Sequence, residues 1–252
     1  MKVALITGAA SGIGQALAVQ YAKSGVAVVG TFFPGDVHDP AVTQGLVEAA
    51  GGKCQMISTN VCDSRQVDAF VQAAIEIYGR IDYVVANAGL IRQASLSQAT
   101  DDHYAQMLEV NLAGVMRTVR AAVPHLKEGG AIVTLSSFLG ACVGASDFSA
   151  YSAAKAGVVG YCRAAAKELA AQKIRINTVI PGLIETPQTL DDVNSVGPAG
   201  LQALAGHIPF QRVGRADEVA SLIFFLTHGE SCYITGQAIA VDGGMTTSSI
   251  VS

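Results

Sequence analysis

A tyrosine and a lysine four positions apart form the most informative pair in the sequence. Tyr151 and Lys155 stand in the segment YSAAK, inside an alanine-rich stretch that predicts a helix. Residues four apart on a helix share one face, so the phenol and the ammonium are expected to point the same way. A nearby cation favours the phenolate, which allows proton exchange with an alcohol or carbonyl oxygen near neutral pH. The pair therefore predicts acid–base chemistry, with an ordinary surface pair as the alternative.

Three glycines near the N-terminus indicate a phosphate-binding turn. Gly8, Gly12 and Gly14 follow the apolar run KVALIT and open a helical stretch. Glycines in such a turn let the backbone approach a pyrophosphate, and the helix N-terminus offers free N–H groups and a partial positive charge. The spacing is GxxxGxG rather than GxGxxG, so a tight turn with no ligand is the alternative.

The elements that must position these residues alternate along the chain. Strands without a polar face, each followed by a helical stretch, predict a parallel sheet covered on both faces. The expected strands are residues 2–7, 26–32, 54–61, 81–89, 131–137, 175–182 and 236–244. The expected helices are residues 14–24, 44–50, 67–78, 102–126, 151–171 and 217–227. The sequence thus predicts an α/β fold, a single Rossmann-type domain over residues 1–252 with a doubly wound parallel sheet of about seven strands.

Residues 185–207 interrupt this alternation. The segment is rich in Gly, Pro and Asp and follows the sixth expected strand. Open α/β sheets bind ligands at the carboxyl ends of their strands, so the position predicts a substrate lid. A passive surface loop is the alternative.

Composition excludes several classes of function. A formal net charge of −4 with no basic block argues against nucleic-acid binding. The uncharged stretch at residues 129–146 is broken by glycines and paired serines and would make a poor membrane span. The N-terminal apolar run is too short for a signal peptide, so we expect a cytoplasmic protein. The five cysteines form no CxxC pair, so we expect buried small side chains and no metal site.

Taken together, these segments resemble the short-chain dehydrogenase/reductase family over essentially the whole chain. TGAASGIG at residues 7–14 is similar to the family's cofactor loop, and ANAG at residues 86–89 to its NNAG segment. VDGG at residues 241–244 is similar to its C-terminal signature. The family's remaining landmarks match in order and spacing: Asn111, the serine pair 136–137, Tyr151 with Lys155, and Pro181-Gly182 followed by Thr186.

The resemblance implies an NAD(P)(H)-dependent oxidoreductase, a short-chain alcohol dehydrogenase/carbonyl reductase that interconverts a secondary alcohol and a ketone. It implies Tyr151 as the general acid/base and Lys155 as its helper, which also binds the nicotinamide ribose. It implies Ser137 as a hydrogen-bond donor to the reacting oxygen and Asn111 as the anchor of a relay water.

The resemblance also implies the residues that bind the ligands. Cofactor contacts are expected from Gly8, Ser11, Gly12, Ile13, Gly14, Phe32, Asn60, Val61, Asn87, Ala88, Gly89, Tyr151, Lys155, Pro181, Gly182, Ile184 and Thr186. Substrate contacts are expected from Ser137, Leu139, Phe148 and Tyr151. The expected substrate is a small to medium, uncharged and partly apolar ketone or alcohol.

The residues that usually select the dinucleotide are missing. Phe32 and Phe33 stand where relatives often carry Asp or Arg, and no Lys or Arg occurs from Ser24 to Gly52. Asp36 and Asp39 lie in the loop expected beside the adenosine ribose. A 2′-phosphate would meet carboxylates and no cation there, which favours NAD(H) over NADP(H).

Two other functions remain open. A β-ketoacyl (3-oxoacyl) reductase would need a basic docking face for an acidic carrier protein, and no basic cluster is visible in the sequence. A nicotinamide-sensing protein without turnover would not need Asn111, Ser137, Tyr151 and Lys155 together. A homotetramer is expected from the resemblance.

Overall fold

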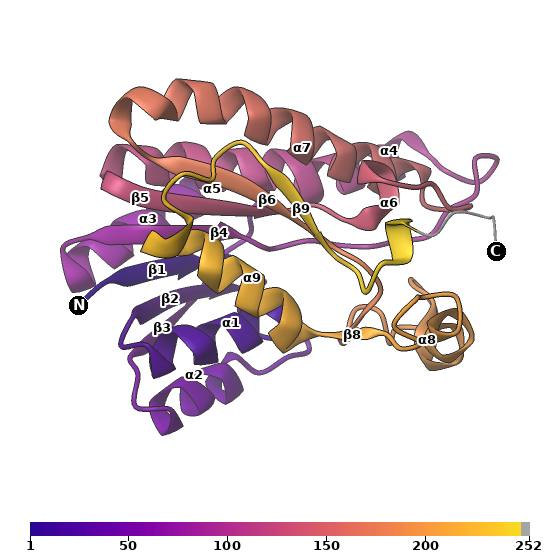
Figure 1. Cartoon of the computed structure of the whole chain (residues 1–252), viewed down its shortest axis with the longest axis horizontal. Helices are drawn as coiled ribbons and strands as arrows, with labels where there is room; N and C mark the ends of the chain where they lie inside the picture. Colours follow the sequence, from indigo (N-terminus) through magenta and orange to yellow (C-terminus); the bar gives the residue numbers. More distant parts are fainter. Residues whose placement is uncertain (248–252) are drawn as a thin grey trace.

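Seven parallel strands form the central sheet, in the order β3-β2-β1-β4-β5-β6-β9 (Figure 1). The computed structural model describes residues 1–247. The strands are β1 (Val3–Ile6), β2 (Ala27–Phe32), β3 (Cys54–Ser58), β4 (Ile81–Ala86), β5 (Leu126–Leu135), β6 (Arg175–Pro181) and β9 (Ala238–Val241). Each lies within or overlaps an expected strand, and the sheet order reverses at β1, as in a doubly wound fold. The predicted fold is confirmed.

Helices cover both faces of the sheet (Figure 1). One face packs against α1 (Gly12–Lys23), α2 (Pro40–Ala49) and α9 (Ala216–Thr227). The other packs against α3 (Ser64–Tyr78), α5 (Gly114–Ala122) and α7 (Ser149–Leu169), with α4 (Asp101–Leu108) beside α7.

Burial on both sides explains why the strands have no polar face. Within β1, Ala4 and Ile6 join the core under α1 and α9, whereas Val3 and Leu5 join the core under α3, α5 and α7. Successive strand residues point to opposite faces, so a strand buried on both faces reads as a continuous apolar run.

The helix expected over residues 102–126 is divided in the structure. A π-helical turn at Glu109–Ala113 separates α4 from α5, and a 3-10 turn at Val123–His125 ends the segment. Leu126 already belongs to β5. Asn111 lies in the π turn, which changes the direction of its side chain relative to a regular helix.

The segment after β6 has more structure than expected. It contains α8 (Gly197–Ala205), and β7 (Ile184–Glu185) pairs with β8 (Gly214–Arg215) in a small second sheet. The helix lies apart from the main body in Figure 1, and Leu183, Leu201 and Ile208 form a separate apolar core beneath it.

Two expectations from composition can be compared with the structure. Within residues 1–247, no helix is both long enough and apolar enough to cross a membrane. The prediction of buried cysteines holds for Cys54 and Cys162, whereas Cys62 is half-buried. It is wrong for Cys142 and Cys232, which are exposed because both lie in surface turns rather than in strands or long helices.

Candidate active site

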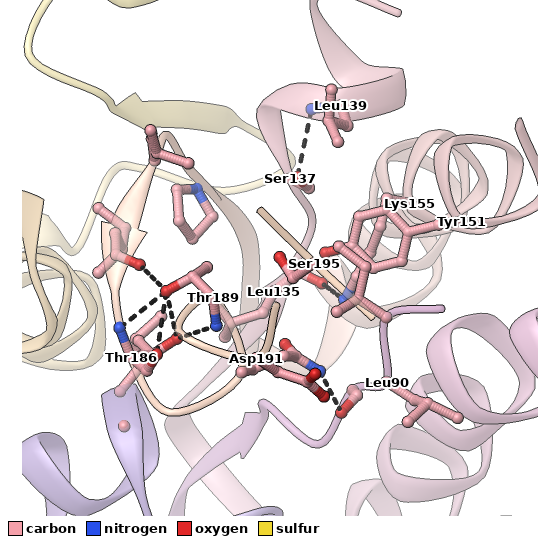
Figure 2. A pocket seen from close by; sticks show the side chains of 18 of the residues that line it. Leu90, Leu135, Ser137, Leu139, Tyr151, Lys155, Thr186, Thr189, Asp191 and Ser195 are labelled. Carbon is pink, nitrogen blue, oxygen red and sulfur yellow. Dashed lines mark hydrogen bonds between the residues drawn. The ribbon is translucent and has the colours of Figure 1, made fainter. Parts of the chain in front are cut away.

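One continuous cavity of about 770 Å³ lies at the carboxyl edge of the sheet and is lined by both the glycine loop and the pair Tyr151 and Lys155. Figure 2 shows part of the lining, including Ser137, Tyr151 and Lys155. Its walls come from the turns after β1, β4, β5 and β6 and from the segment that contains α8. This is the edge at which open α/β sheets bind ligands. The topology therefore brings together motifs that are far apart in the sequence.

The glycine loop is shaped by its contacts with the end of β4. Gly8 adopts φ +67°, and a Cβ on Gly14 would lie 2.1 Å from the Gly8 carbonyl oxygen. The Asn87 side-chain amide donates to the Thr7 and Gly8 carbonyl oxygens at 3.0 and 2.9 Å. The Thr7 hydroxyl accepts from the backbone N–H groups of Asn87 and Ala88, each at 3.0 Å. Glycine is thus required at position 14 by close backbone approach.

The residues present fit the dinucleotide that the glycine loop implies. Helix α1 begins at Gly12, and its N-cap Ser11 is extended with no side-chain capping bond, so the first N–H groups of the helix remain available to phosphate. Gly12 adopts φ +54° and lies 3.5 Å, measured from an ideal Cβ position, from Thr186 on the opposite wall. This turn and Lys155 line the same cavity.

Most of the sequence-predicted ligand residues line this cavity. They are Gly8, Ser11, Gly12, Ile13, Asn87, Ala88, Gly89, Ser137, Leu139, Phe148, Tyr151, Lys155, Pro181, Gly182, Ile184 and Thr186. Gly14, Phe32, Asn60, Val61 and Asn111 are not among the lining residues. Direct contact of those five with a ligand stays a prediction.

The five outlying residues have definable positions. Gly14 lies inside the turn, and Phe32 ends β2. The Asn60 side-chain carbonyl accepts from Cys62 N–H at 3.0 Å, and Val61 is buried. The fully buried Asn111 side chain accepts from Leu90 N–H at 3.0 Å and donates to the Leu90 carbonyl at 2.8 Å. Asn111 thus holds Leu90, a residue of the cavity wall, in place without lining the cavity itself.

The two adjacent serines have different partners. The Ser136 hydroxyl donates to the Lys155 backbone carbonyl at 2.7 Å and so ties the end of β5 to α7. The Ser137 side chain lies near the Tyr151 phenol and lowers its pKa. Ser137 also accepts from Leu139 N–H at 3.2 Å. Of the two, Ser137 is the serine that faces the phenol.

Burial dominates the electrostatics of the catalytic pair. It raises the pKa of Tyr151 to about 12 and lowers the pKa of Lys155 to about 8. The Lys155 ammonium donates to the Leu135 carbonyl at 3.0 Å and lies 5.7 Å from the centroid of the Tyr151 ring. Burial is the largest cause of the raised Tyr151 pKa, and Ser137 lowers it in part; the expectation that Lys155 depresses this pKa stays a prediction.

Gly140 packs against the backbone of α7 next to Tyr151. Gly140 adopts φ +90°, and a Cβ there would lie 2.0 Å from the Ser152 carbonyl oxygen. We expect Gly140→Ala to lower stability by about 2–4 kcal/mol and to reduce turnover, because backbone next to Tyr151 must move. Urea unfolding and kcat measurements check this.

A matched glycine separates this steric effect from a general effect of alanine. Gly45 lies on the exposed face of α2, with nothing within 4 Å of an added Cβ. Gly45→Ala should raise stability by about 0.5–1 kcal/mol through helix propensity. Equal stability of the two variants would contradict the assigned role of Gly140.

Sequence reasoning missed part of the substrate end of the cavity. Val143, Ser195, Val196 and Met245 line it, although none carried a motif. Met245 could have been found, because it follows the carboxyl end of β9, where ligands are expected. Residues 191–196 had no periodic pattern that places them.

Within residues 1–247, no group of three His, Cys, Asp or Glu side chains is arranged to hold a metal ion.

The comparisons with known proteins agree with this geometry. A family profile described as enoyl-(acyl carrier protein) reductase matches residues 8–246. The 3-oxoacyl-[acyl-carrier-protein] reductase FabG of Thermotoga maritima is 39% identical over 97% of this chain and 97% of its own. The FabG of Escherichia coli is 33% identical, with the same coverage of both chains.

Solved structures show the same architecture. A levodione reductase superimposes with a TM-score of 0.92 at 30% identity, covering 98% of each chain. A short-chain dehydrogenase/reductase from Serratia marcescens has a TM-score of 0.90 at 27% identity, over 97% of this chain and 98% of its own. The chain belongs to the short-chain dehydrogenase/reductase family of NAD(P)(H)-dependent oxidoreductases.

Proposed function

We propose that this protein reduces the carbonyl group of a small, partly apolar ketone, with NAD(P)H as the hydride donor. The observation that carries the proposal is the convergence of Ser137, Tyr151 and Lys155 at one end of a cavity whose other end is the glycine loop. The bound nicotinamide supplies the hydride, and the protein supplies position and proton transfer.

The proton chemistry follows from the two hydroxyl groups. Tyr151, whose pKa is raised to about 12, keeps its proton at neutral pH and is therefore ready to donate it to the carbonyl oxygen. Ser137 donates a second hydrogen bond to the same oxygen, where negative charge develops. The Lys155 ammonium replaces the proton through the relay that the Asn111 segment supports.

The walls of the substrate half favour an apolar ligand. Ile91, Leu139, Val143, Phe148 and Leu204 line it. Residues 185–207 act as the substrate lid in this proposal. Two glutamines support that role by connecting the lid with the segment after β4: Gln188 donates to the Gly89 carbonyl at 3.2 Å, and Gln93 donates to the Ser195 carbonyl.

A spectrophotometric assay of the purified protein tests the function. We expect oxidation of NADH or NADPH at 340 nm that depends on an added ketone, measured over aliphatic and cyclic ketones and β-keto esters. Cofactor binding without turnover of any substrate would instead support the nicotinamide-sensing alternative.

A 3-oxoacyl-[acyl-carrier-protein] reductase is the second candidate, favoured by the 39% identity with the Thermotoga maritima protein. An acidic carrier protein needs a basic docking face. Among the described residues that line the cavity, Lys155 and Arg92 are the only lysine or arginine side chains, and Lys155 is buried. Comparison of kcat/KM for acetoacetyl-carrier protein with that for a free β-keto ester distinguishes the two: strong preference for the carrier-bound substrate would favour the second candidate.

For the cofactor, we propose NAD(H) over NADP(H), supported by Asp36 in the wall beside the glycine loop. We expect Asp36→Asn to tighten NADPH binding about fivefold, because removal of one nearby carboxylate relieves about 1 kcal/mol of repulsion, while NADH binding changes less than about twofold. The dissociation constants follow from nicotinamide fluorescence.

The matched control for this variant is Asp68→Asn. Asp68 is exposed on α3 and does not line the cavity, so the change in net charge is the same. Tighter binding of NADPH than of NADH by the unaltered protein would contradict the preference.

The homotetramer stays a prediction, for which the exposed small residues Ala153, Ala156, Gly160 and Ala164 on α7 offer a surface.

A further inference from the structure

The substrate half of the cavity contains two charged side chains that the proposed proton transfer does not use. Among the described lining residues, Asp36 and His38 lie at the glycine-loop end, and Lys155 belongs to the catalytic group. Arg92 and Asp191 remain. Arg92 follows β4, and Asp191, labelled in Figure 2, belongs to residues 185–207. The substrate half of the cavity therefore has one cation and one anion on different segments.

The Asp191 side chain is hydrogen-bonded to groups within its own segment. Its carboxylate accepts from the backbone N–H groups of Val193 and Asn194 at 3.0 and 3.1 Å and from the Asn194 side chain at 2.8 Å. These bonds lower the pKa of Asp191, and the charge of Arg92 contributes least among the causes. Asp191 is thus a satisfied anion that organises a turn.

Arg92 is in the opposite situation. A guanidinium has five N–H donors. Within the part of the chain that the structure describes, Arg92 makes one side-chain hydrogen bond, from Nη1 to the Ile91 carbonyl at 2.7 Å, and forms no ion pair. The side chain is half-buried and lines the same cavity as Ser137 and Tyr151. Its remaining donors are available to a molecule in the pocket.

We propose that Arg92 is a specificity-determining residue that binds a carboxylate of the substrate at a distance from the reacting carbonyl. This inference rests on the proposed ketone reduction and names the substrate class as oxo-carboxylates, in place of the uncharged ketone expected from the sequence. An arginine fork matches a carboxylate with two parallel N–H···O bonds, which makes this the strongest pairing open to it. The apolar walls would hold the carbon chain between the two polar ends.

The test compares pairs of substrates of similar size, one anionic and one neutral. Acetoacetate and levulinate serve as the anionic probes, each paired with the methyl ketone in which an isopropyl group replaces the carboxylate. We expect the unaltered protein to give a higher kcat/KM for at least one anionic probe than for its partner. Arg92→Gln should reduce that ratio by about 10- to 100-fold, mainly through KM, because a charged hydrogen bond is lost. The kcat/KM for the neutral ketone should stay within about twofold.

Two further variants exclude a merely structural effect. Arg65→Gln removes the same charge from an exposed position on α3 and should leave the ratio unchanged. Arg92→Lys keeps the charge without the fork, so it should restore part of the preference. The inference would be overturned if Arg92→Gln lowered kcat/KM equally for the anionic and the neutral substrate. It would also be overturned if the unaltered protein preferred the neutral ketone in both pairs. Absence of turnover with every ketone would overturn the proposed function itself.

Discussion

Tyr151→Phe is expected to lower kcat/KM for ketone reduction by about 10²- to 10⁴-fold, which is the usual contribution of a positioned acid or base. The ring stays in place because Ile91, Met107, Leu139 and Phe148 pack in the same apolar cluster. Only the hydroxyl, with its proton and its interaction with Ser137, is removed. The dissociation constant for NAD(P)H should change by less than about threefold, since most of the cofactor contacts lie elsewhere.

The pH dependence of turnover by the unaltered protein follows from the same role of Tyr151. Because the pKa of Tyr151 is raised to about 12, the phenol is protonated throughout the neutral range and serves as an acid in reduction. Alcohol oxidation needs the phenolate instead, so its rate should keep rising with pH through the alkaline range. Stopped assays in both directions at several pH values measure this.

Tyr161→Phe is the matched control for the loss of the hydroxyl. Tyr161 lies on the same helix, half-buried, and does not line the cavity. Its removal should leave turnover within about twofold. Unchanged turnover in Tyr151→Phe would remove the phenol from the mechanism, and loss of cofactor binding in that variant would assign it a structural role.

Lys155→Met is expected to abolish efficient turnover and, at the same time, to stabilise the protein. Lys155 is 4% exposed, and burial lowers its pKa from 10.5 to about 8. That difference corresponds to a penalty of about 3 kcal/mol for the charged form. A methionine fills the same space without the charge but leaves the Leu135 carbonyl unpaired, which offsets about 1–2 kcal/mol. A net gain of about 1–2 kcal/mol at pH 7 follows.

The gain in stability of Lys155→Met should disappear at high pH. Below pH 8 both the folded and the unfolded lysine are protonated, so the full penalty acts on the folded state. Between pH 8 and 10.5 the unfolded chain binds more protons, so the stability of the unaltered protein rises relative to the variant. Above that range both forms are neutral. Urea unfolding of both proteins across these pH values measures the difference; a variant less stable at pH 7 would contradict the penalty.

Periodicity was sufficient to predict the sheet. The central strands β1, β2 and β4 are buried on both faces, which produces continuous apolar runs, whereas the edge strands β3 and β9 are partly exposed. Tertiary contacts decided where the elements end. The helix expected to reach residue 126 stops earlier because Leu126 pairs with Ile81 at the start of β4. The π turn around Asn111 has no sequence periodicity of its own.

The candidate site was predictable where motifs are local. Tyr151 with Lys155, and the glycines before α1, act through spacing that the sequence displays. The roles of Arg92 and Asp191 depend on which hydrogen bonds each side chain makes after folding, and no spacing rule reports that. The pKa of Tyr151 depends on burial, which raises it, and on Ser137, which lowers it, and only the surrounding atoms determine which effect is larger.

The Asn87 amide has a thermodynamic consequence for ligand binding. It bonds the glycine loop from a position 80 residues away in the sequence, directly after β4, the central strand of the sheet. The loop is therefore held in place before a dinucleotide arrives, and we expect little backbone freedom to be lost on association. We expect calorimetry to show a small entropic cost of ordering and a heat-capacity change that reflects buried ligand surface rather than folding of the loop.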